Sequence, residues 1–286
     1  MAERQESALD AALRRMSSQD PSRPRSLSIV QSIELARDHG ATRREVEVAA
    51  LRAGLPPQRY RRNYGTVGIQ GQIRLLESTV GVVGAGGLGG WVIEALARMG
   101  IGHLIIIDGD VFEENNLNRQ ACCTEATLGQ PKAAAAAERA SQVNGAVVTT
   151  VHHEWLTEAN AVPLLHGARI LVDALDSLPA RIMLQAAARE LRVPLVHGAI
   201  AGYTGQVMTI YPEDAGLASI YGPGPYPEHG VEAQLGNPTA TPMMVAAWQV
   251  QQVVQYLTGH ERGLLRNRLL LLDAQAGDAL TLNLGE

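Results

Sequence analysis

The chain has 286 residues, of which 46% are hydrophobic and 19% charged, enough for one large α/β domain or a domain with an appendage. Its net charge of −5 excludes a general attraction to nucleic acid, no apolar run is long enough to span a membrane, and the polar first residues lack the apolar core of a signal peptide. The two cysteines, Cys122 and Cys123, are adjacent, so they form neither a disulfide framework nor a C-x-x-C zinc half-site, and we expect a reduced, cytoplasmic protein.

The first 57 residues predict a helical extension. Helix, turn and helix with basic character leave a DNA-binding module open, because residues 1–63 hold 12 arginines against 8 acidic residues. No base-reading pattern of polar side chains is evident, however, and we expect an appendage without a nucleic-acid partner. The expected segments are an amphipathic helix at 1–17, a linker at 17–26 and helices at 29–39 and 42–53.

Residues 58–81 begin with a basic run, Arg59-Tyr60-Arg61-Arg62-Asn63. Two interpretations are open. The segment is either a solvated basic loop or an arm that reaches a polyanion, in its own subunit or in a partner subunit.

A glycine-rich stretch, VGVVGAGGLGG at 80–90, follows. It predicts a strand, a glycine turn and the start of a helix, where free backbone N–H groups and the helix dipole favour a phosphate. Gly84 would permit the tight turn, Gly86 the close approach of a pyrophosphate, and Gly89 the close packing of helix on sheet. This motif indicates a nucleotide site and leaves the reaction open.

The next segments separate the candidate nucleotides. Asp108 ends an apolar strand 24 positions after Gly84, where a dinucleotide fold places the carboxylate that binds a ribose hydroxyl, in NAD or in ATP. A polar loop with Arg119 follows, and then Lys132, the only lysine beside 23 arginines. A chance surface lysine is the alternative, but cations at this place favour an enzyme that splits ATP between its phosphates over a dehydrogenase.

Two acidic residues follow the strand at 170–173. Asp173 and Asp176 could hold Mg²⁺ through water, or cap the helix that begins near Pro179. We expect metal or nucleotide contact for Asp176 and a structural role for Asp173. We also expect His197 to be a packed strand residue and not a base.

The second half of the chain completes the sheet and adds one long segment. Residues 212–242 are rich in Pro and Gly and too long for an idle connector, so we expect a lid or a track for an extended peptide. The remaining expected elements are strands at 147–151, 194–197 and 205–211, an apolar helix at 243–257, and closing strands at 269–272 and 280–284.

Taken together, these motifs resemble the ThiF/MoeB/HesA adenylyltransferases, bacterial relatives of ubiquitin-activating enzymes, over about residues 58–284. Each piece is weak, but the combination in family order is specific. The pieces are Arg59-Tyr60-x-Arg62, Gly84-x-Gly86-Gly87-Leu88-Gly89, Asp108-x-Asp110, Asn116-Leu117-Asn118-Arg119-Gln120, Gly129-Gln-Pro-Lys132-Ala, Asp173-x-x-Asp176 with Arg181, and Gly205-Gln206.

The resemblance implies an α/β fold: a Rossmann-like adenylation domain at 58–286, with a mostly parallel sheet flanked by helices, behind the N-terminal extension. It implies a homodimer that uses ATP and Mg²⁺ to adenylate the C-terminal Gly-Gly of a small ubiquitin-like sulfur carrier, releasing pyrophosphate. The reaction would serve synthesis of a molybdenum- or tungsten-pterin cofactor or of thiamine. Residues 212–242 would be the crossover loop over the carrier tail.

Site residues follow from the same resemblance. Asp108 would hold the ribose, Asp176 would serve Mg²⁺ and the reacting centre, and Arg62 would reach the triphosphate of the other subunit. The catalytic set is then Arg62, Arg119, Lys132 and Asp176. The nucleotide-binding set is Gly84, Gly86, Gly87, Gly89, Asp108, Asp110, Asn115, Asn116, Arg119, Gln120, Lys132, Asp176 and Ser177.

The chain also departs from the family pattern. Many relatives carry two C-x-x-C pairs for zinc, but no cysteine occurs at 214–222 or near the end of the sequence, so we expect no zinc. Without a rhodanese-like domain the sulfur donor would be a separate protein, and Cys122 and Cys123 are expected to be small buried residues. The rival hypotheses are a same-fold enzyme that activates another carboxylate, such as the cyclising dehydratase of a modified tRNA adenosine, and a catalytically silent carrier-binding protein.

Overall fold

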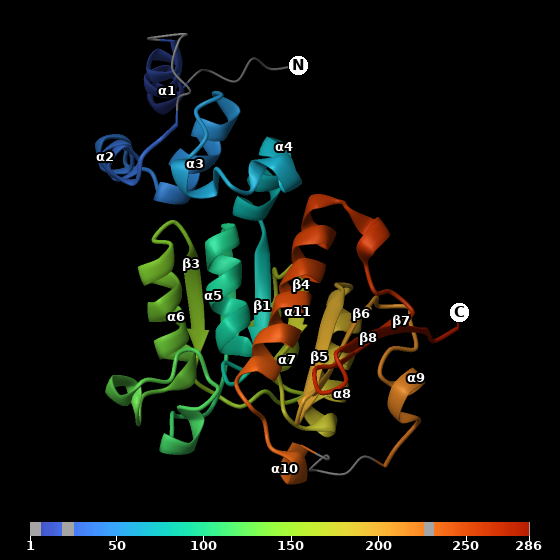
Figure 1. Cartoon of the computed structure of the whole chain (residues 1–286). Coiled ribbons are helices and arrows are strands. Elements are labelled where there is room, and N and C mark those ends of the chain that lie inside the picture. Colours follow the sequence, from blue (N-terminus) through green and yellow to red (C-terminus); the bar gives the residue numbers. More distant parts are fainter. Residues whose placement is uncertain (1–6, 19–25, 226–231, 286) are drawn as a thin grey trace.

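The structure, a computed structural model, describes residues 7–18, 26–225 and 232–285. Its centre is an eight-stranded sheet with the order β3-β2-β1-β4-β5-β6-β7-β8 (Figure 1). The first five strands in this order are parallel, and β6, β7 and β8 are added antiparallel. The predicted α/β fold with a mostly parallel sheet is therefore confirmed. The strands are β1 (Thr79–Val83), β2 (His103–Ile107), β3 (Val148–His152), β4 (Ile170–Asp173), β5 (Leu195–Ala201), β6 (Thr204–Ile210), β7 (Arg268–Asp273) and β8 (Asp278–Asn283).

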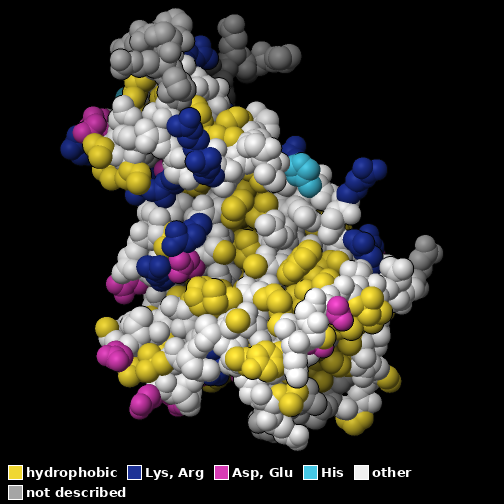
Figure 2. Space-filling view, viewed as in Figure 1, with side chains coloured by type: hydrophobic (Ala, Val, Ile, Leu, Met, Phe, Trp, Pro, Cys, Tyr) yellow, Lys and Arg dark blue, Asp and Glu magenta, His cyan; other side chains and the backbone are white. Residues whose placement is uncertain are grey.

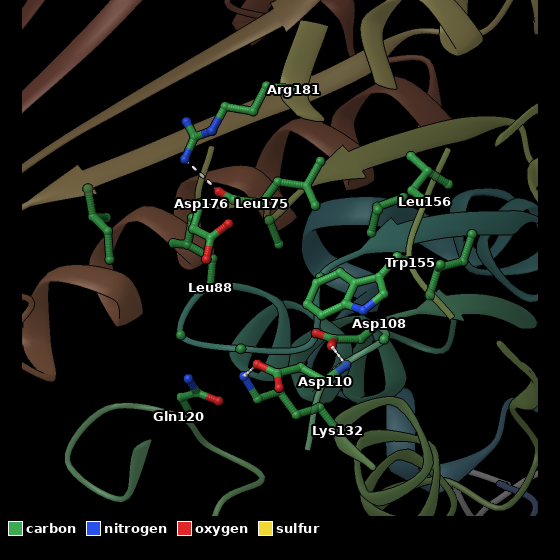
Figure 3. A pocket seen from close by; sticks show the side chains of 18 of the residues that line it. Leu88, Asp108, Asp110, Gln120, Lys132, Trp155, Leu156, Leu175, Asp176 and Arg181 are labelled. Carbon is green, nitrogen blue, oxygen red and sulfur yellow. Dashed lines mark hydrogen bonds and ion pairs between the residues drawn. The ribbon is translucent and has the colours of Figure 1, made fainter. Parts of the chain in front are cut away.

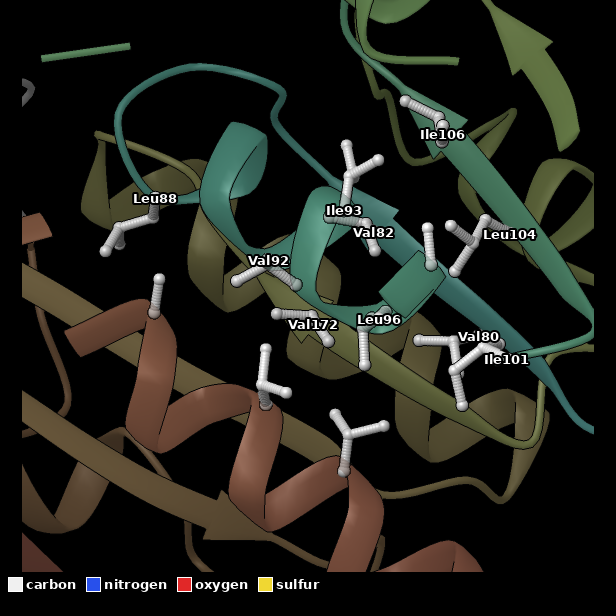
Figure 4. Packing of buried hydrophobic residues seen from close by; sticks show 14 of the residues in the cluster. Val80, Val82, Leu88, Val92, Ile93, Leu96, Ile101, Leu104, Ile106 and Val172 are labelled. Carbon is white, nitrogen blue, oxygen red and sulfur yellow. The ribbon is translucent and has the colours of Figure 1, made fainter. Parts of the chain in front are cut away.

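Helices cover both faces of the sheet, which is why the central strands read as continuous apolar runs. One face carries α5 (Gly89–Met99), α6 (Lys132–Val143) and α11 (Ala240–Thr258), and the other carries α7 (Ala161–Leu165) and α8 (Leu178–Leu191). Alternate residues along a strand point into the two hydrophobic cores, one on each face of the sheet. Val80 and Val82 pack against Val92 and Leu96 of α5 (Figure 4), whereas Val83 belongs to the core under α8.

The N-terminal helices lie at the end of the sheet where the parallel strands begin (Figure 1). They are α1 (Ala8–Ser18), α2 (Ile29–His39), α3 (Arg43–Arg52) and α4 (Tyr64–Leu76). Ser28 and Thr42 cap α2 and α3: each hydroxyl accepts the backbone N–H of the residue three positions on, whose side chain accepts the N–H of the cap residue. Both helices therefore begin within one residue of the predicted start. Five of the ten residues of α3 are buried, so this helix is held by packing within the extension and against α4.

The basic run at 59–63 is an anchored turn. Tyr60 is fully buried; its hydroxyl donates to Glu47 of α3 at 3.0 Å and accepts from Asn144 at 2.9 Å. Arg59 bonds to Asn144 as well and lies 3.8 Å from Glu47, whose pKa is raised by burial. The loop interpretation of 58–81 is wrong, because this turn is fixed on both sides and α4 follows it, with a kink at Gly68 (φ 69°).

Shorter elements complete the chain. They are the 3₁₀ turns Gln58–Tyr60, Glu114–Asn116, Glu125–Thr127 and Glu261–Gly263, and the one-turn helices α9 (Ala218–Tyr221) and α10 (Glu232–Leu235). The long segment at 212–242 therefore contains two short helices; residues 226–231 lie outside the described part. Among the described helices, none is both long enough and apolar enough to cross a membrane.

Candidate active site

A cavity opens at the carboxyl ends of β1, β2 and β4. The chain leaves β1 toward β2 on one side and returns to β4 on the other, and open α/β sheets bind ligands at this reversal. Figure 3 shows the side chains that converge there. The wall is formed by Val83, Gly84, Gly86, Gly87, Leu88, Ile107, Asp108, Gly109, Asp110, Arg119, Gln120, Lys132, Glu154, Trp155, Leu156, Ala174, Leu175, Asp176, Arg181, Ile200 and Asn237.

The glycine turn forms the floor of this cavity. Gly84 has a φ of 94°, and a Cβ there would lie 2.4 Å from the carbonyl oxygen of Ala174; a Cβ on Gly89 would lie 1.8 Å from that of Gly84. Only glycine fits either position. At Gly86 and Gly87 the nearest neighbours of a Cβ would be 3.5 and 3.9 Å away, so here the bare backbone leaves room beside the helix start.

Asp108 fastens the end of β2 to the glycine turn. Its carboxylate accepts the backbone N–H groups of Ala85 at 2.6 Å and of Asp110 at 2.8 Å. Burial raises the pKa of Asp108, and these two hydrogen bonds oppose the rise. Each carboxylate oxygen can accept a second hydrogen bond, so a ribose hydroxyl can still bind here.

Lys132 begins α6 beside the same strand end. Its ammonium lies 2.5 Å from a carboxylate oxygen of Asp110, and its backbone N–H donates to the Asp110 carbonyl. The Lys132 side chain is 9% exposed and that of Asp110 is 44% exposed. Burial works against the charge on Asp110, but the hydrogen bond from Lys132 holds its pKa below the ordinary value. The lysine is therefore fixed at the cavity wall.

The loop after β2 brings two polar side chains to the wall. Arg119 donates to the carbonyl of Asn115 and to the side chain of Asn118, both at 3.0 Å. Gln120 is buried, and its side-chain carbonyl oxygen has no hydrogen-bond partner among the described residues. Asn116 is turned into the loop, where its side chain accepts from the N–H of Glu113.

Asp176 follows β4 and is exposed at the cavity. Asp173 is buried and bonded to the N–H of Leu175 and to His197, and His197 is fully buried in its strand, as expected. The described residues contain no group of three His, Cys, Asp or Glu that could hold a metal. Mg²⁺ is commonly bound by one or two carboxylates together with substrate phosphates and water, and Asp176 supplies a donor of that kind.

Five residues predicted from the sequence lie outside the cavity wall. Asn115 and Asn116 belong to the surface loop, Gly89 is enclosed by packing, Ser177 precedes α8, and Arg62 is exposed on the turn before α4. That turn lies at the end of the sheet opposite the cavity (Figure 1).

Among the wall residues that the sequence analysis did not predict are Trp155 and Asn237. Trp155, in the loop after β3, is 69% exposed and packs over Gly109; in Figure 3 its indole lies beside Asp108. An exposed indole beside a carboxylate that can accept a further hydrogen bond suits stacking on a flat base. Asn237 comes from the end of the long segment, and its backbone carbonyl accepts a hydrogen bond from the side chain of Asn118. A tryptophan shortly after the predicted strand at 147–151 was the available signal, and it has no fixed spacing from any motif.

A second cavity, of about 650 Å³, adjoins the first. Asp176, Arg181 and Ile200 border both. Its other walls come from β5 to β8 and from Tyr221 of α9. Cys122 and Cys123 are buried, as expected, and line neither cavity; burial raises the pKa of Cys122 to about 12.

Comparison with known proteins gives close sequence relatives. The chain is 36% identical over 212 residues to the SAMP-activating enzyme E1 of Haloferax volcanii, covering 73% of this chain and 77% of the relative. It is 35% identical over 215 residues to the sulfur carrier protein adenylyltransferase of Thermus thermophilus, covering 73% and 79%. Adenylyltransferase and sulfurtransferase MOCS3-2 of Zea mays is 35% identical over 209 residues, covering 72% of this chain but 43% of the relative. The chain thus spans about half the length, or less, of several curated relatives.

A solved structure agrees with the fold. Escherichia coli tRNA N6-threonylcarbamoyladenosine dehydratase, TcdA, in complex with ATP, superposes with a TM-score of 0.61 at 25% identity, covering 71% of this chain and 95% of that one. The sequence model of the ThiF family matches residues 60–285, which are most of the chain and include every residue of the cavity wall. The chain therefore belongs to the ThiF family.

Proposed function

We propose that this protein uses Mg-ATP to adenylate the C-terminal carboxylate of a small ubiquitin-like sulfur carrier that ends in Gly-Gly. The observation that carries the proposal is the junction of the two cavities at Asp176 and Arg181, beside a glycine turn with Lys132 and Arg119. The first cavity offers a base platform, a ribose carboxylate and phosphate-binding cations. The second is open to an extended peptide. The names of the Haloferax and Thermus relatives support the same substrate class.

The chemistry requires positioning more than reactive side chains. The carrier carboxylate attacks the α-phosphorus, a carboxylate–phosphorus bond forms, and the bond to the pyrophosphate oxygen breaks without net proton transfer. Lys132 and Arg119 stabilise the charge that grows on the leaving pyrophosphate, and the backbone at Gly86 and Gly87 receives a phosphate at the start of α5. Asp176 would hold Mg²⁺, which neutralises phosphate charge when bound.

The second cavity is proposed to receive the carrier tail. Its walls include the apolar side chains of Ile200, Leu271 and Leu280, and it ends at Asp176. A Gly-Gly terminus can lie close to both walls because it has no side chains. Tyr221 and Asn237, from opposite ends of the long segment, border the second and first cavity respectively, in keeping with a crossover above the tail.

We also propose that the enzyme is a homodimer in which Arg62 acts on the nucleotide of the partner subunit. Arg62 is exposed and does not border the cavity of its own chain. Figure 2 shows apolar side chains gathered over α5 and α11, and on α11 Met243 is 43% and Trp248 39% exposed. A subunit interface on this face would cover them.

Exchange of labelled pyrophosphate into ATP tests the function. We expect exchange that depends on a carrier ending in Gly-Gly, proceeds without added zinc, and disappears when the carrier lacks its last glycine. Exchange that needs no carrier, or that no carrier of this class supports, would contradict the proposal. Sulfur transfer would then use a separate donor protein.

The second candidate is activation of a carboxylate on a modified tRNA. The likeness to TcdA and the basic side chains over the N-terminal helices (Figure 2) favour it. ATP consumption stimulated by modified tRNA, and not by a carrier, would select this candidate.

A further inference from the structure

We propose that a buried chain of hydrogen bonds through His197 couples the second cavity to the loop that carries Asp176. This inference rests on the proposed function, because it takes the second cavity as the place of the carrier tail. It makes His197 and Tyr221 positioning residues for Asp176. Neither has a role in the proposed chemistry itself.

The chain of hydrogen bonds crosses four elements. The side-chain amide of Gln206, on β6, donates to the hydroxyl of Tyr221 on α9 and to Nε2 of His197 on β5, the latter at 3.1 Å. Nδ1 of His197 lies 2.7 Å from Oδ2 of Asp173 at the end of β4. The other oxygen of Asp173 accepts the backbone N–H of Leu175 at 3.0 Å.

The directions of these bonds are mutually consistent. With the amide nitrogen of Gln206 facing it, Nε2 of His197 accepts, and the ring proton then resides on Nδ1, which donates to the carboxylate of Asp173. This requires a neutral imidazole. Burial lowers the pKa of His197, which favours the neutral form. Protonation of Nε2 would place two donors face to face and break the chain at Gln206.

The position of this pair is unusual for a purely structural role. His197 and Asp173 are both fully buried and sit opposite each other in the register of β4 and β5. Buried charged or polar pairs are often no more stabilising than apolar residues of equal size. Parallel strands pair well with apolar side chains alone, as Val172 and Val196 do at the preceding register position. Stability therefore does not explain why a carboxylate and an imidazole occupy this site.

One end of the chain fixes the backbone that precedes Asp176. Asp173 holds the N–H of Leu175, and Arg181 donates to the carbonyl of Leu175 at 2.5 Å and to that of Gly198 at 3.2 Å. Both backbone groups of Leu175 are thus held. Asp176 is the next residue, so the direction of its side chain into the two cavities depends on how the backbone of Leu175 is held.

The other end of the chain lies in the second cavity. Gln206 and Tyr221 border that cavity, and Asp176 and Arg181 border both cavities. A peptide that fills the second cavity therefore contacts the Gln206–Tyr221 end, and its effect is carried through His197 to Leu175. Allosteric coupling of this kind raises the affinity for nucleotide when the tail is bound, and for the tail when the nucleotide is bound.

Tyr221→Phe is the most selective test. It removes the hydroxyl and keeps the ring, which meets His197 edge-on at 6.5 Å between ring centroids. Tyr203→Phe is the matched control, because Tyr203 is 55% exposed and borders neither cavity. His197→Asn breaks the chain at its centre.

We expect Tyr221→Phe to leave the Kd for Mg-ATP alone within about twofold of the unmodified protein. The KM for a carrier ending in Gly-Gly should rise about tenfold, the value of one hydrogen bond. The carrier-induced gain in ATP affinity should fall toward one. The double variant Tyr221→Phe/His197→Asn should have a KM for the carrier no higher than that of the poorer single variant, because both substitutions break the same chain of hydrogen bonds. Equal losses of ATP affinity with and without carrier, or additive effects, would overturn the inference.

Amide hydrogen exchange gives a readout that needs no carrier. In His197→Asn the N–H of Leu175 should exchange faster, whereas the β1 amides should not change. Unchanged exchange at residues 174–177 would refute the coupling even if carrier-dependent adenylation is found. Lack of carrier dependence in the unmodified protein, with faster exchange at 174–177 in the variant, would refute the proposed function and leave the mechanical link in place.

Discussion

Replacing Lys132 by alanine should remove most of the adenylation activity and leave the fold nearly as stable as before. Lys132 is the chain's only lysine, and its ammonium is held 2.5 Å from Asp110 at the wall of the first cavity, the proposed nucleotide site. Preorganised positive charge at this place acts where negative charge grows in the transition state. The ion pair with Asp110 aims the lysine and contributes little else.

The expected loss of rate is large and the expected loss of folding stability is small, for separate reasons. Loss of one preorganised group that stabilises transition-state charge costs about 2.7–4 kcal/mol, or roughly 10²–10³ in rate. Asp110 is 44% exposed, so water solvates its carboxylate once the lysine is gone, and the stability loss should stay within about 1 kcal/mol. Lys132 holds the pKa of Asp110 down, so the pair's contribution is present above the ordinary Asp pKa and lost as pH falls.

Pyrophosphate exchange and thermal unfolding should be measured on the same preparations. Arg139→Ala is the matched control, because Arg139 also lies on α6, pairs with Glu94 and is outside the cavity wall. The control should exchange at nearly the unmodified rate. Near-normal exchange by Lys132→Ala would show that the lysine is incidental.

The uniqueness of Lys132 also permits a chemical test. In this chain an amine-acylating reagent can react with Lys132 and the α-amino group alone. Mg-ATP should protect Lys132 and leave labelling of the N-terminus unchanged. Equal labelling of Lys132 with and without Mg-ATP would place the nucleotide elsewhere.

Three other outcomes follow from the structure. Trp155→Ala should raise the Kd for ATP by about fivefold to 150-fold, since stacking on a base contributes about 1–3 kcal/mol, whereas Tyr203→Phe should not change the Kd measured by nucleotide titration. Mixed Arg62→Ala and Lys132→Ala subunits should regain about a quarter of the exchange activity if Arg62 acts across a symmetric dimer, and none if it acts within its own subunit. Burial raises the pKa of Glu47, so the stability that its protonated form contributes is lost as pH rises. In urea unfolding, the free energy of unfolding of Glu47→Gln relative to the unmodified protein should therefore be higher at about pH 7 than at about pH 4. An equal difference in unfolding free energy at the two pH values would contradict this.

The sheet was predictable because its central strands are buried on both faces and therefore read as short apolar runs. The helix α4 was not. Gly65, Gly68 and Gly71 interrupt its pattern, and Gly68 has a non-helical φ of 69° within it. The helix is held by packing against α11 and by tertiary hydrogen bonds such as that of Gln72 with the carbonyl of Met99, none of which a local pattern contains.

The wall of the first cavity was predictable where residues are tied to a strand end. Asp108, Lys132 and Asp176 each follow or adjoin a parallel strand, and the carboxyl ends of these strands meet at one edge. The loop amides Asn115 and Asn116 could not be placed in this way, because the fold of the loop turns Asn116 inward to bond with Glu113. Trp155 has no fixed spacing from any motif and enters the cavity only because the loop after β3 folds over Gly109.

The choice between NAD and ATP depends on what the end of β2 holds, and not on the glycine turn. Asp108 joins the turn at Ala85 to the backbone of Asp110, and Asp110 in turn holds Lys132. Two carboxylates two residues apart thus connect the glycine turn to the cation through one rigid strand end. A dehydrogenase needs the first of these carboxylates and gains nothing from the second. Exchanging Asp110 for alanine should therefore impair pyrophosphate exchange through a misplaced Lys132 while ATP binding itself weakens less, and equal losses in both would show that Asp110 contributes to nucleotide affinity alone.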